Sequence, residues 1–511
     1  MADIFDSYRL ADAWDEMFAQ PGQPRPPYAA LLAALQPLDP ADLRFRSDQL
    51  ARVFTDRGVT YDFAGEERPF PLDLIPRVID AAEWDLIARG VRQRVLALEA
   101  FLADVYGPRH VFADGVLPWR AVCTSQHFHR AVAGLTPPNG VRIHVAGIDL
   151  VRDSAGRIRV LEDNVRVPSG VSYVIENRLA MTRTFPGLFD GQHVHPVSGY
   201  PAQLLAALRA AAPVATPDPV VVVLSPGPAN AAYFEHALLA RLMGVELVQG
   251  GDLTCSGNRV FVHTTRGLRP VDVIYRRLDD EFLDPLQFRP DSVIGCPGIV
   301  NAARAGQVTI ANAVGNGVAD DKLLYTWVPD LIRYYLREEP LLPNVESYRL
   351  DDPEVLNWVL DGLDRLVLKP VDGAGGSGIV IGPRADEQTL AALRAQVAAN
   401  PRGWIAQQPV ALSTSPVLIG EQLAPRHIDL RPFAVNDGSD VWLLPGGLTR
   451  VALPEGELVV NSSRGGGSKD TWVLAESGAP GPAAAAVLIP APPGPASGAR
   501  RQTGPALDGQ Q

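Results

Sequence analysis

From residue 81 to residue 106 the chain places apolar side chains three and four positions apart, which predicts one long amphipathic helix. The period then falls to two. Residues 141–152 and 157–164 alternate apolar and polar side chains, and the segment 153–156 between them has the composition of a turn. The two alternating segments therefore predict a β-hairpin.

Predicted helices and strands alternate between residues 200 and 310, and this order indicates a doubly wound α/β unit. Its expected helices are 203–211 and 231–243, its strands are 220–224, 246–248 and 271–275, and it includes a hairpin at 259–264. Farther along, the pattern predicts a helix over 322–339 and strands at 366–369, 379–381, 404–407, 417–421, 428–435 and 441–444.

The composition narrows the class of protein. Of 511 residues, 46% are apolar and 20% are charged, which is the balance of a globular chain and not of a disordered one. The 58 acidic residues outnumber the 46 lysines and arginines, giving a net charge of −12. Proteins that coat nucleic acids carry the opposite excess, so we expect no nucleic-acid partner.

Compartment follows from what the sequence does and does not contain. No run of 18 apolar residues predicts a membrane span, and the first 30 residues lack a signal-peptide layout. The three cysteines form no CxxC pair and are expected to be reduced, buried small residues. We therefore expect a cytoplasmic protein with no membrane partner. Residues 477–511 are rich in Ala, Pro and Gly and predict a disordered tail.

A glycine-rich segment carries the strongest chemical signal. One predicted strand ends at Lys369, and the loop after it contains Gly373, Gly375, Gly376, Ser377 and Gly378. Glycines let backbone N–H groups approach phosphate oxygens without a Cβ in the way, and a lysine adds a point charge for phosphate. Because a strand follows, the segment is neither a Walker A loop nor a dinucleotide fingerprint. A plain glycine-rich hairpin turn is the alternative.

An acidic strand end is the second signal. Glu162 and Asn164 are two apart on a predicted strand, so their side chains emerge on one face, and Asp149 lies on the partner strand. Carboxylate and amide oxygens are hard ligands suited to Mg²⁺. Arg166 just beyond is placed to hold a phosphate or a carboxylate. The alternative is a solvated acidic cluster.

Two later segments add weaker signals. Asp429 and Arg431 share one strand face, an arrangement that is also a common structural brace. Residues 444–452, which include Arg450, and residues 459–472 are rich in Gly, Ser, Arg and Lys, and offer donors to an anion. A flexible surface loop is the alternative for these two ranges.

In this order the motifs resemble the circularly permuted ATP-grasp family, type 2, which is related to the synthetase domain of glutathionylspermidine synthetase. The acidic strand precedes Lys369, whereas in ordinary ATP-grasp proteins it follows the glycine-rich loop. The segments that carry the resemblance are 162–173, 312–325, 369–378, 427–433 and 445–472. Glutathionylspermidine synthetase has an arginine where this chain has Gly147, which argues against a thiol-peptide substrate.

The resemblance implies a role for each candidate residue. Lys322 and Lys369 would contact ATP phosphates, and the loop of Gly373, Gly375, Gly376, Ser377 and Gly378 would close over them. Adenine would lie against Gln407, Gln408 and Val410, and Mg²⁺ would be bound by Asp149, Glu162 and Asn164. Catalytic arginines would be Arg431, Arg450 and Arg166.

The resemblance also implies a fold and an activity. We expect the α/β class, with the α+β lobes of a circularly permuted ATP-grasp fold, an accompanying doubly wound α/β domain and a helical N-terminal region. The expected divisions are an arm at 1–40, the helical region 41–135, metal-binding strands 136–200, the doubly wound domain 201–311, nucleotide-binding lobes 312–476 and the tail 477–511.

The expected function is an ATP- and Mg²⁺-dependent carboxylate–amine ligase that forms an amide through an acylphosphate. Its substrates would be a small-molecule or peptide carboxylate and an amine. The alternatives are an ATP-dependent phosphotransferase and a non-catalytic nucleotide-binding protein. The resemblance further suggests an alpha-helical partner and a transglutaminase-like protein in a peptide-modification system.

Overall fold

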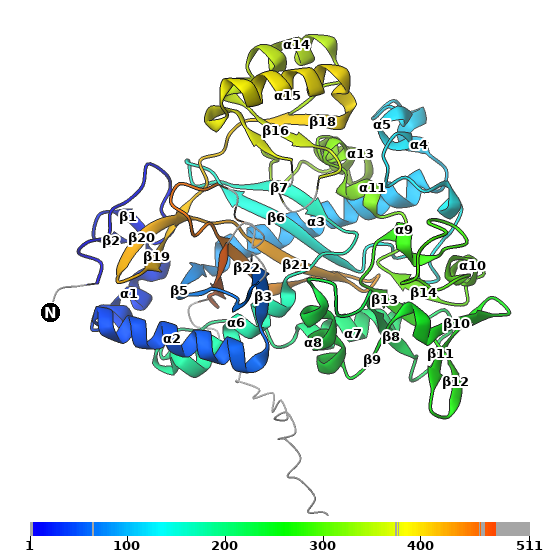
Figure 1. The fold of residues 1–511 in the computed structure, drawn as a ribbon, viewed down its shortest axis with the longest axis horizontal. Helices are drawn as coiled ribbons and strands as arrows, with labels where there is room; N and C mark the ends of the chain where they lie inside the picture. The colour runs from blue at the N-terminus through cyan, green and yellow to red at the C-terminus, as the bar shows by residue number, and fades with distance from the viewer. Residues whose placement is uncertain are drawn as a thin grey trace, which may run out of the picture.

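The computed structural model describes residues 4–63, 66–373, 376, 378–458, 460 and 466–476. The predicted tail, 477–511, lies outside them. At the centre is a mixed sheet in the order β5-β23-β22-β21-β6-β7 (Figure 1). Its strands are β5 (Leu72–Ile79), β6 (Val145–Arg152), β7 (Ile158–Asn164), β21 (Arg431–Asn436), β22 (Val441–Val451) and β23 (Gly467–Val473). Strands from the early and the late parts of the chain therefore share one sheet.

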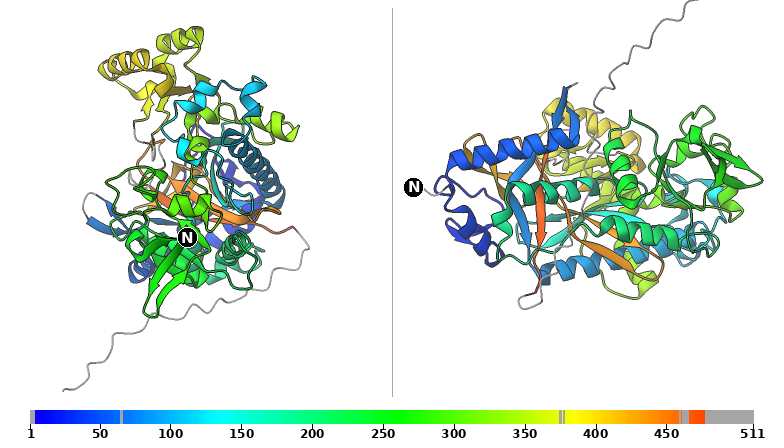
Figure 2. Two further views of the ribbon diagram at one scale, coloured as in Figure 1. Left: turned by 90° about the vertical axis from the view of Figure 1, so that its right-hand side faces the viewer. Right: turned by 90° about the horizontal axis from the view of Figure 1, so that it is seen from below.

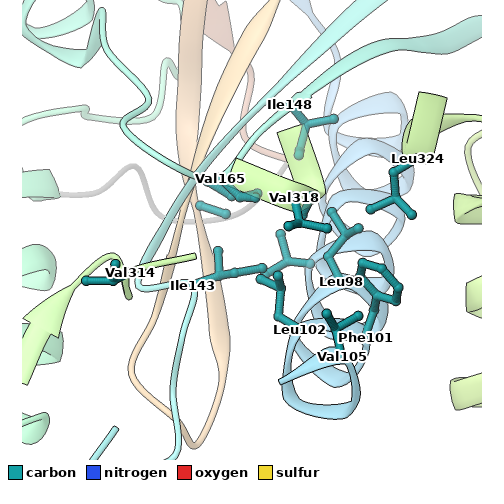
Figure 3. Close-up of a cluster of buried hydrophobic side chains, with 14 of the residues drawn as sticks. Leu98, Phe101, Leu102, Val105, Ile143, Ile148, Val165, Val314, Val318 and Leu324 are labelled. Atoms are coloured by element: carbon teal, nitrogen blue, oxygen red, sulfur yellow. The ribbon is translucent and has the colours of Figure 1, made fainter. Parts of the chain in front are cut away.

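The predicted hairpin is confirmed as β6 and β7, which pair antiparallel with Asp149 opposite Glu162 and Gly147 opposite Asn164. The predicted long helix is confirmed as α3 (Ala81–Val105), whose N-cap Asp80 accepts a hydrogen bond from Glu83 N. Figure 3 shows one buried cluster in which Leu98, Phe101, Leu102 and Val105 of α3 gather with Ile148 of β6 and with Ile143, Val165, Val318 and Leu324 from neighbouring segments.

The predicted doubly wound unit is a parallel sheet in the order β14-β13-β8-β9. It consists of β8 (Val221–Leu224), β9 (Glu246–Val248), β13 (Val273–Arg276) and β14 (Thr309–Ala311), with α7 (Tyr200–Ala210), α8 (Tyr233–Met243) and α10 (Ile299–Arg304). The expected hairpin has a third strand, since β10 (Leu253–Ser256), β11 (Arg259–Thr264) and β12 (Gly267–Pro270) form one antiparallel sheet.

A smaller lobe projects from the side of the central sheet where β7 lies (Figures 1 and 2). It contains β15 (Ser347–Arg349), β16 (Val367–Pro370), β17 (Val380–Ile381) and β18 (Trp404–Gln407), with α14 (Pro353–Asp361) and α15 (Glu387–Ala399). Its own core includes Leu350, Val359, Leu368, Leu393 and Ala406.

Two local predictions differ from the structure. The helix expected at 322–339 is wrong as one element, because it divides into α12 (Lys322–Tyr325) and α13 (Val328–Leu336), with Pro329 in the first turn of α13. The strand expected at 417–421 is half of a hairpin made by β19 (Thr414–Ile419) and β20 (Gln422–His427), which turns at Gly420 with φ 62°.

The N-terminal segment is built into the central part of the molecule. Glu16 is buried and accepts hydrogen bonds from Arg77 on β5 and from Arg152 on β6. The elements around it are β1 (Phe18–Gln20), β2 (Gln23–Pro24), α1 (Ala29–Leu35), α2 (Pro40–Arg57), β3 (Thr60–Phe63) and β4 (Glu66–Pro69). The remaining α-helices of the described residues are α4 (His110–Ala113), α5 (Trp119–Cys123), α6 (Val171–Thr184), α9 (Asp280–Leu283) and α11 (Gly317–Asp320). Among the described residues, none of the helices has the length and apolar character needed to span a bilayer.

Candidate functional site

A cavity lies between the central sheet and the smaller lobe. Strands β6, β7, β21 and β22 form one side of it, and β16, β17 and β18 form the other. Most of the residues predicted from the sequence line it: Asp149, Glu162, Asn164, Lys369, Gly376, Gln407, Gln408, Val410, Arg431 and Arg450. Side chains from separate parts of the chain thus converge on one space.

The end of β7 presents its polar residues on opposite faces, as its period of two requires. Glu162 and Asn164 line the cavity, whereas Asp163 between them is buried on the other side. There Asp163 accepts two hydrogen bonds from Arg94 of α3, at 2.5 Å from Nε and 2.7 Å from Nη2. The ion pair therefore fixes the strand from behind and leaves Glu162 and Asn164 toward the cavity.

These cavity-facing groups fit a hard cation. The Glu162 carboxylate and the Asn164 amide supply oxygen ligands of the kind that Mg²⁺ takes. The Asn164 Nδ2 atom is buried and has no hydrogen-bond partner within the described part of the chain. An acceptor atom of a bound ligand, such as a phosphate oxygen, could complete this N–H donor, whereas the cation itself could not.

Two lysines lie near the Glu162 carboxylate. Lys322, at the start of α12, donates from Nζ to Glu162 Oε1 at 3.0 Å and also to the Gly373 carbonyl oxygen. Lys369 on β16 is buried, and burial lowers the pKa of its ammonium to about 8, because the charged form loses hydration. The nearby charge of Lys322 acts in the same direction, while Glu162 opposes it.

The arginines form a compact network with two aspartates. Arg431 donates from Nε to Asp149 Oδ1 at 2.5 Å and from Nη2 to Oδ2 at 2.8 Å. Arg450 Nη2 lies 2.7 Å from Asp149 Oδ2, and Arg450 also holds Asp429. Burial by itself would raise the pKa of Asp149, but the two arginine charges outweigh burial and lower that pKa to about 2. Asp149 is therefore ionised, and both of its carboxylate oxygens accept hydrogen bonds from arginines.

Gly147 lets the Arg431 side chain pack closely against strand β6. A Cβ at Gly147 would lie 3.1 Å from Pro168 Cβ and 3.2 Å from Arg431 Cδ. Any side chain at this position would therefore press on the Arg431 stem. Glutathionylspermidine synthetase has an arginine at this position. In this chain the position is Gly147, and the Arg431 side chain packs directly against β6 there.

The other predicted residues have different places. Arg166 is not among the cavity-lining residues; its guanidinium lies 3.3 Å from Asp279 and 3.6 Å from Asp320. Gly378 has φ 74°, and a Cβ there would meet Pro370 at 3.0 Å. Gly373 contacts Lys322 through its carbonyl oxygen. Gly375 and Ser377 lie outside the described residues, so their roles stay predictions.

Sequence reasoning missed the apolar wall of the cavity. The apolar lining residues are Leu161, Val345, Val367, Ile379, Ile381, Pro409, Leu412, Leu458 and Val460. No chemical motif distinguishes them from ordinary core residues. Asp429, noted above as sharing a strand face with Arg431, also lines the cavity, where it accepts hydrogen bonds from Arg450.

Comparison with known proteins gives a consistent assignment. The family model described as circularly permuted ATP-grasp type 2 matches residues 76–452. An uncharacterised protein of Mycobacterium leprae is 59% identical over 92% of this chain and 85% of its own length. An uncharacterised Synechocystis protein is 50% identical, with 92% of this chain and 98% of that protein covered.

Two further relatives extend the comparison. A Frankia alni protein provisionally named a glutamate–cysteine ligase is 46% identical over 92% of this chain, which spans 54% of that protein. Among solved structures, a glutathione synthetase-like effector from Globodera pallida has a TM-score of 0.56 at 13% identity, covering 86% of this chain and 98% of its own. At that identity the likeness concerns the fold alone.

Proposed function

The chain belongs to the circularly permuted ATP-grasp family, type 2, and from this premise we propose that it is an ATP-dependent carboxylate–amine ligase. The observation that carries the proposal is the convergence of a buried lysine, two arginines and the Glu162 carboxylate on one cavity, with a second lysine, Lys322, donating to Glu162. The proposed product is an amide formed through an acylphosphate. The acid and the amine are small molecules or peptides.

The cavity has a polar and an apolar part, and each suits a part of ATP. Apolar side chains and the Gln407–Val410 segment suit a purine ring, since ligand pockets pair apolar walls with a few placed polar groups. Lys369 lines the polar part, where phosphates would lie. Lys322 is next to this part, because it donates a hydrogen bond to Glu162, which also lines it. Glu162 and Asn164 would hold Mg²⁺. The bound cation would offset charge on the phosphoryl oxygens.

The chemistry of amide formation explains the need for these charges. A carboxylate resists attack by an amine because its leaving group is poor. Transfer of the γ-phosphoryl to the carboxylate forms a C–O–P linkage, and the amine then displaces phosphate. Lys369 stabilises negative charge on the phosphoryl, and Arg450 offers Nη1, which has no hydrogen-bond partner among the described residues.

The name of the Frankia relative supports the reaction class. A glutamate–cysteine ligase forms an amide from an acid and an amine, as proposed here. This chain spans only about half of that protein, so the support concerns the class and not the two substrates.

The test measures nucleotide binding and ADP release by the purified full-length protein. We expect calorimetric titration with ATP and Mg²⁺ to show saturable binding that Glu162→Gln and Lys369→Ala each weaken at least about tenfold. Arg92→Ala is the matched control, because Arg92 is an exposed cation paired with Asp440 outside the cavity. Retention of ATP turnover by both site variants would refute the site.

A screen of acids and amines then separates the alternatives. A ligase releases ADP in multiple turnovers only when an acid and an amine are both present. ADP release with one acceptor and a stable phosphorylated product would instead establish a phosphotransferase. Binding without ADP release in any combination would favour a non-catalytic nucleotide-binding protein.

A further inference from the structure

Two thiols lie side by side in the doubly wound unit. Cys255 is the third residue of β10, and Cys296 precedes α10 by three residues. Their Sγ atoms are 3.6 Å apart although the residues are 41 positions apart in the chain. Neither residue lines the candidate active site. Their closeness thus needs an explanation separate from the proposed ligase.

The scaffold holds both thiols in place. Cys255 is paired with Val260 in the β10–β11 ladder. On the other side, Cys296 N donates to the Leu283 carbonyl at 2.9 Å. The buried Asp284 carboxylate accepts from Gly298 N and from Val300 N, each at 3.0 Å. The segment that carries Cys296 is therefore tied down on both sides of the thiol.

Close packing at Gly298 keeps this segment against β10. A Cβ at Gly298 would lie 3.3 Å from Cys255 Cβ, and Gly298 has φ 87°, a backbone conformation that favours glycine. The approach of the two thiols is thus a consequence of backbone placement.

The two thiols differ in access and in acidity. Cys255 is partly exposed, whereas Cys296 is fully buried. The hydrogen bond from Cys296 lowers the pKa of Cys255, and the same contact together with burial raises the pKa of Cys296. Cys255 is therefore the thiol that an oxidant reaches first, and Cys296 is the thiol that follows.

We propose that Cys255 and Cys296 are an oxidative modification site that a peroxide converts into an intramolecular disulfide. The Cys255 thiolate attacks one peroxide oxygen and breaks the O–O bond, which gives a sulfenic acid and a hydroxide or alkoxide that takes a proton from solvent and leaves as water or an alcohol. Cys296 sulfur then attacks the Cys255 sulfur, the S–O bond breaks, and water leaves with the proton of the Cys296 thiol. The peroxide is reduced by two electrons and the thiol pair is oxidised by two.

The required movement is small. Bond formation brings the sulfurs from 3.6 Å to about 2.05 Å. A metal site is a poorer explanation, because the described residues contain no group of three or more His, Cys, Asp and Glu arranged to hold an ion. The disulfide would tie the β10–β11–β12 sheet to α10.

The experiment treats the full-length protein with a small excess of hydrogen peroxide and counts thiols after denaturation. The untreated chain has three cysteines, and we expect the treated chain to keep only Cys123. Peptide mapping without reductant should join the Cys255 and Cys296 peptides, and dithiothreitol should restore all thiols. Cys123→Ser should still lose two thiols, whereas Cys255→Ser should lose none.

Other outcomes would overturn the proposal. Three free thiols after treatment, oxygen added to Cys255 beside a free Cys296, or a disulfide between two chains would each do so. Because Cys296 is buried, its replacement can disturb folding, so the partly exposed Cys255 carries the variant test. Circular dichroism and a thermal melt verify that Cys255→Ser is folded.

Discussion

Arg431 grips both carboxylate oxygens of Asp149, with its Nε 2.5 Å from Oδ1 and its Nη2 2.8 Å from Oδ2. Arg450 adds a third charge-assisted hydrogen bond to Oδ2. A divalent cation beside Asp149 would therefore stand close to two guanidinium groups, whose repulsion falls off slowly in a buried site. Asp149 is available to a metal only if the arginines move or a polyanion lies between the charges.

The first prediction concerns this competition. Arg431→Ala should bind free Mn²⁺, used in place of Mg²⁺ and measured by electron paramagnetic resonance, about tenfold more tightly than the native protein, because about 1.4 kcal/mol of repulsion corresponds to tenfold. The same variant should bind a non-hydrolysable ATP analogue more weakly. Arg92→Ala should change neither affinity. Unchanged or weaker Mn²⁺ binding by Arg431→Ala would show that arginine and metal do not compete.

The second prediction contrasts two neighbouring residues. Asp163→Asn leaves the buried Arg94 without a counter-charge and should lower the free energy of unfolding by about 3–5 kcal/mol in urea titration. Glu162→Gln should cost less than about 1 kcal/mol, since the Glu162 side chain is partly exposed. Its loss should appear instead in metal-dependent nucleotide binding. Equal stability losses in the two variants would contradict the opposite placement of the two side chains.

The third prediction is a pH dependence of nucleotide binding. Burial holds the pKa of Lys369 at about 8, so the free protein loses this positive charge as the pH rises through that value. Phosphates favour the charged form. Affinity for Mg-ATP should therefore fall above about pH 8, by at most about tenfold per pH unit. Calorimetry on Lys369→Arg, whose side chain stays charged, should show no such fall. If the affinity of this variant still falls, a group other than Lys369 causes the pH dependence.

The fourth prediction concerns acid stability. Burial alone would raise the pKa of Glu16, but the charges of Arg77 and Arg152 outweigh burial and lower that pKa to about 2. A carboxylate with a lowered pKa stabilises the fold above its unfolded value of about 4.5, and this stabilisation is lost as the pH falls toward 2. Urea titrations of Glu16→Gln should show a loss of about 3–5 kcal/mol at neutral pH and a flatter acid response.

Glu421→Gln is the control for that experiment. Glu421 pairs with Arg44 at the surface, where both side chains are about half exposed or more. Its replacement should change stability by less than about 1 kcal/mol at any pH. If Glu16→Gln behaves like Glu421→Gln, the buried network does not determine the acid response.

Local periodicity predicted much of the site, and tertiary contacts account for what it missed. Alternation placed Glu162 and Asn164 on one face, and the hairpin register put Asp149 opposite Glu162. Arg166 lies beyond the end of β7, where a period of two no longer specifies direction. Its placement depends on Asp279 and Asp320, which belong to distant segments.

The apolar wall of the cavity could not be predicted from the sequence for a related reason. Val345 and Leu458 lie in irregular segments, and only the folded chain brings them to the cavity. The split of the helix expected at 322–339 was foreseeable from Pro329. Strand β20 was not predicted from the sequence, because Pro425 and the basic residues after it are unusual inside a strand. Sheets tolerate such residues near their edges.

The pairing of β5 with β23 has a consequence for the order in which the molecule can assemble during synthesis. β5 ends at Ile79, whereas its partner β23 begins at Gly467. A growing chain must therefore carry β5, and the β21-facing edge of β6, as open strand edges until the last third of the protein has been translated. Over the same interval the Asp149 carboxylate has neither of its arginines. These unpaired strand edges are the surfaces that a chaperone would bind during synthesis.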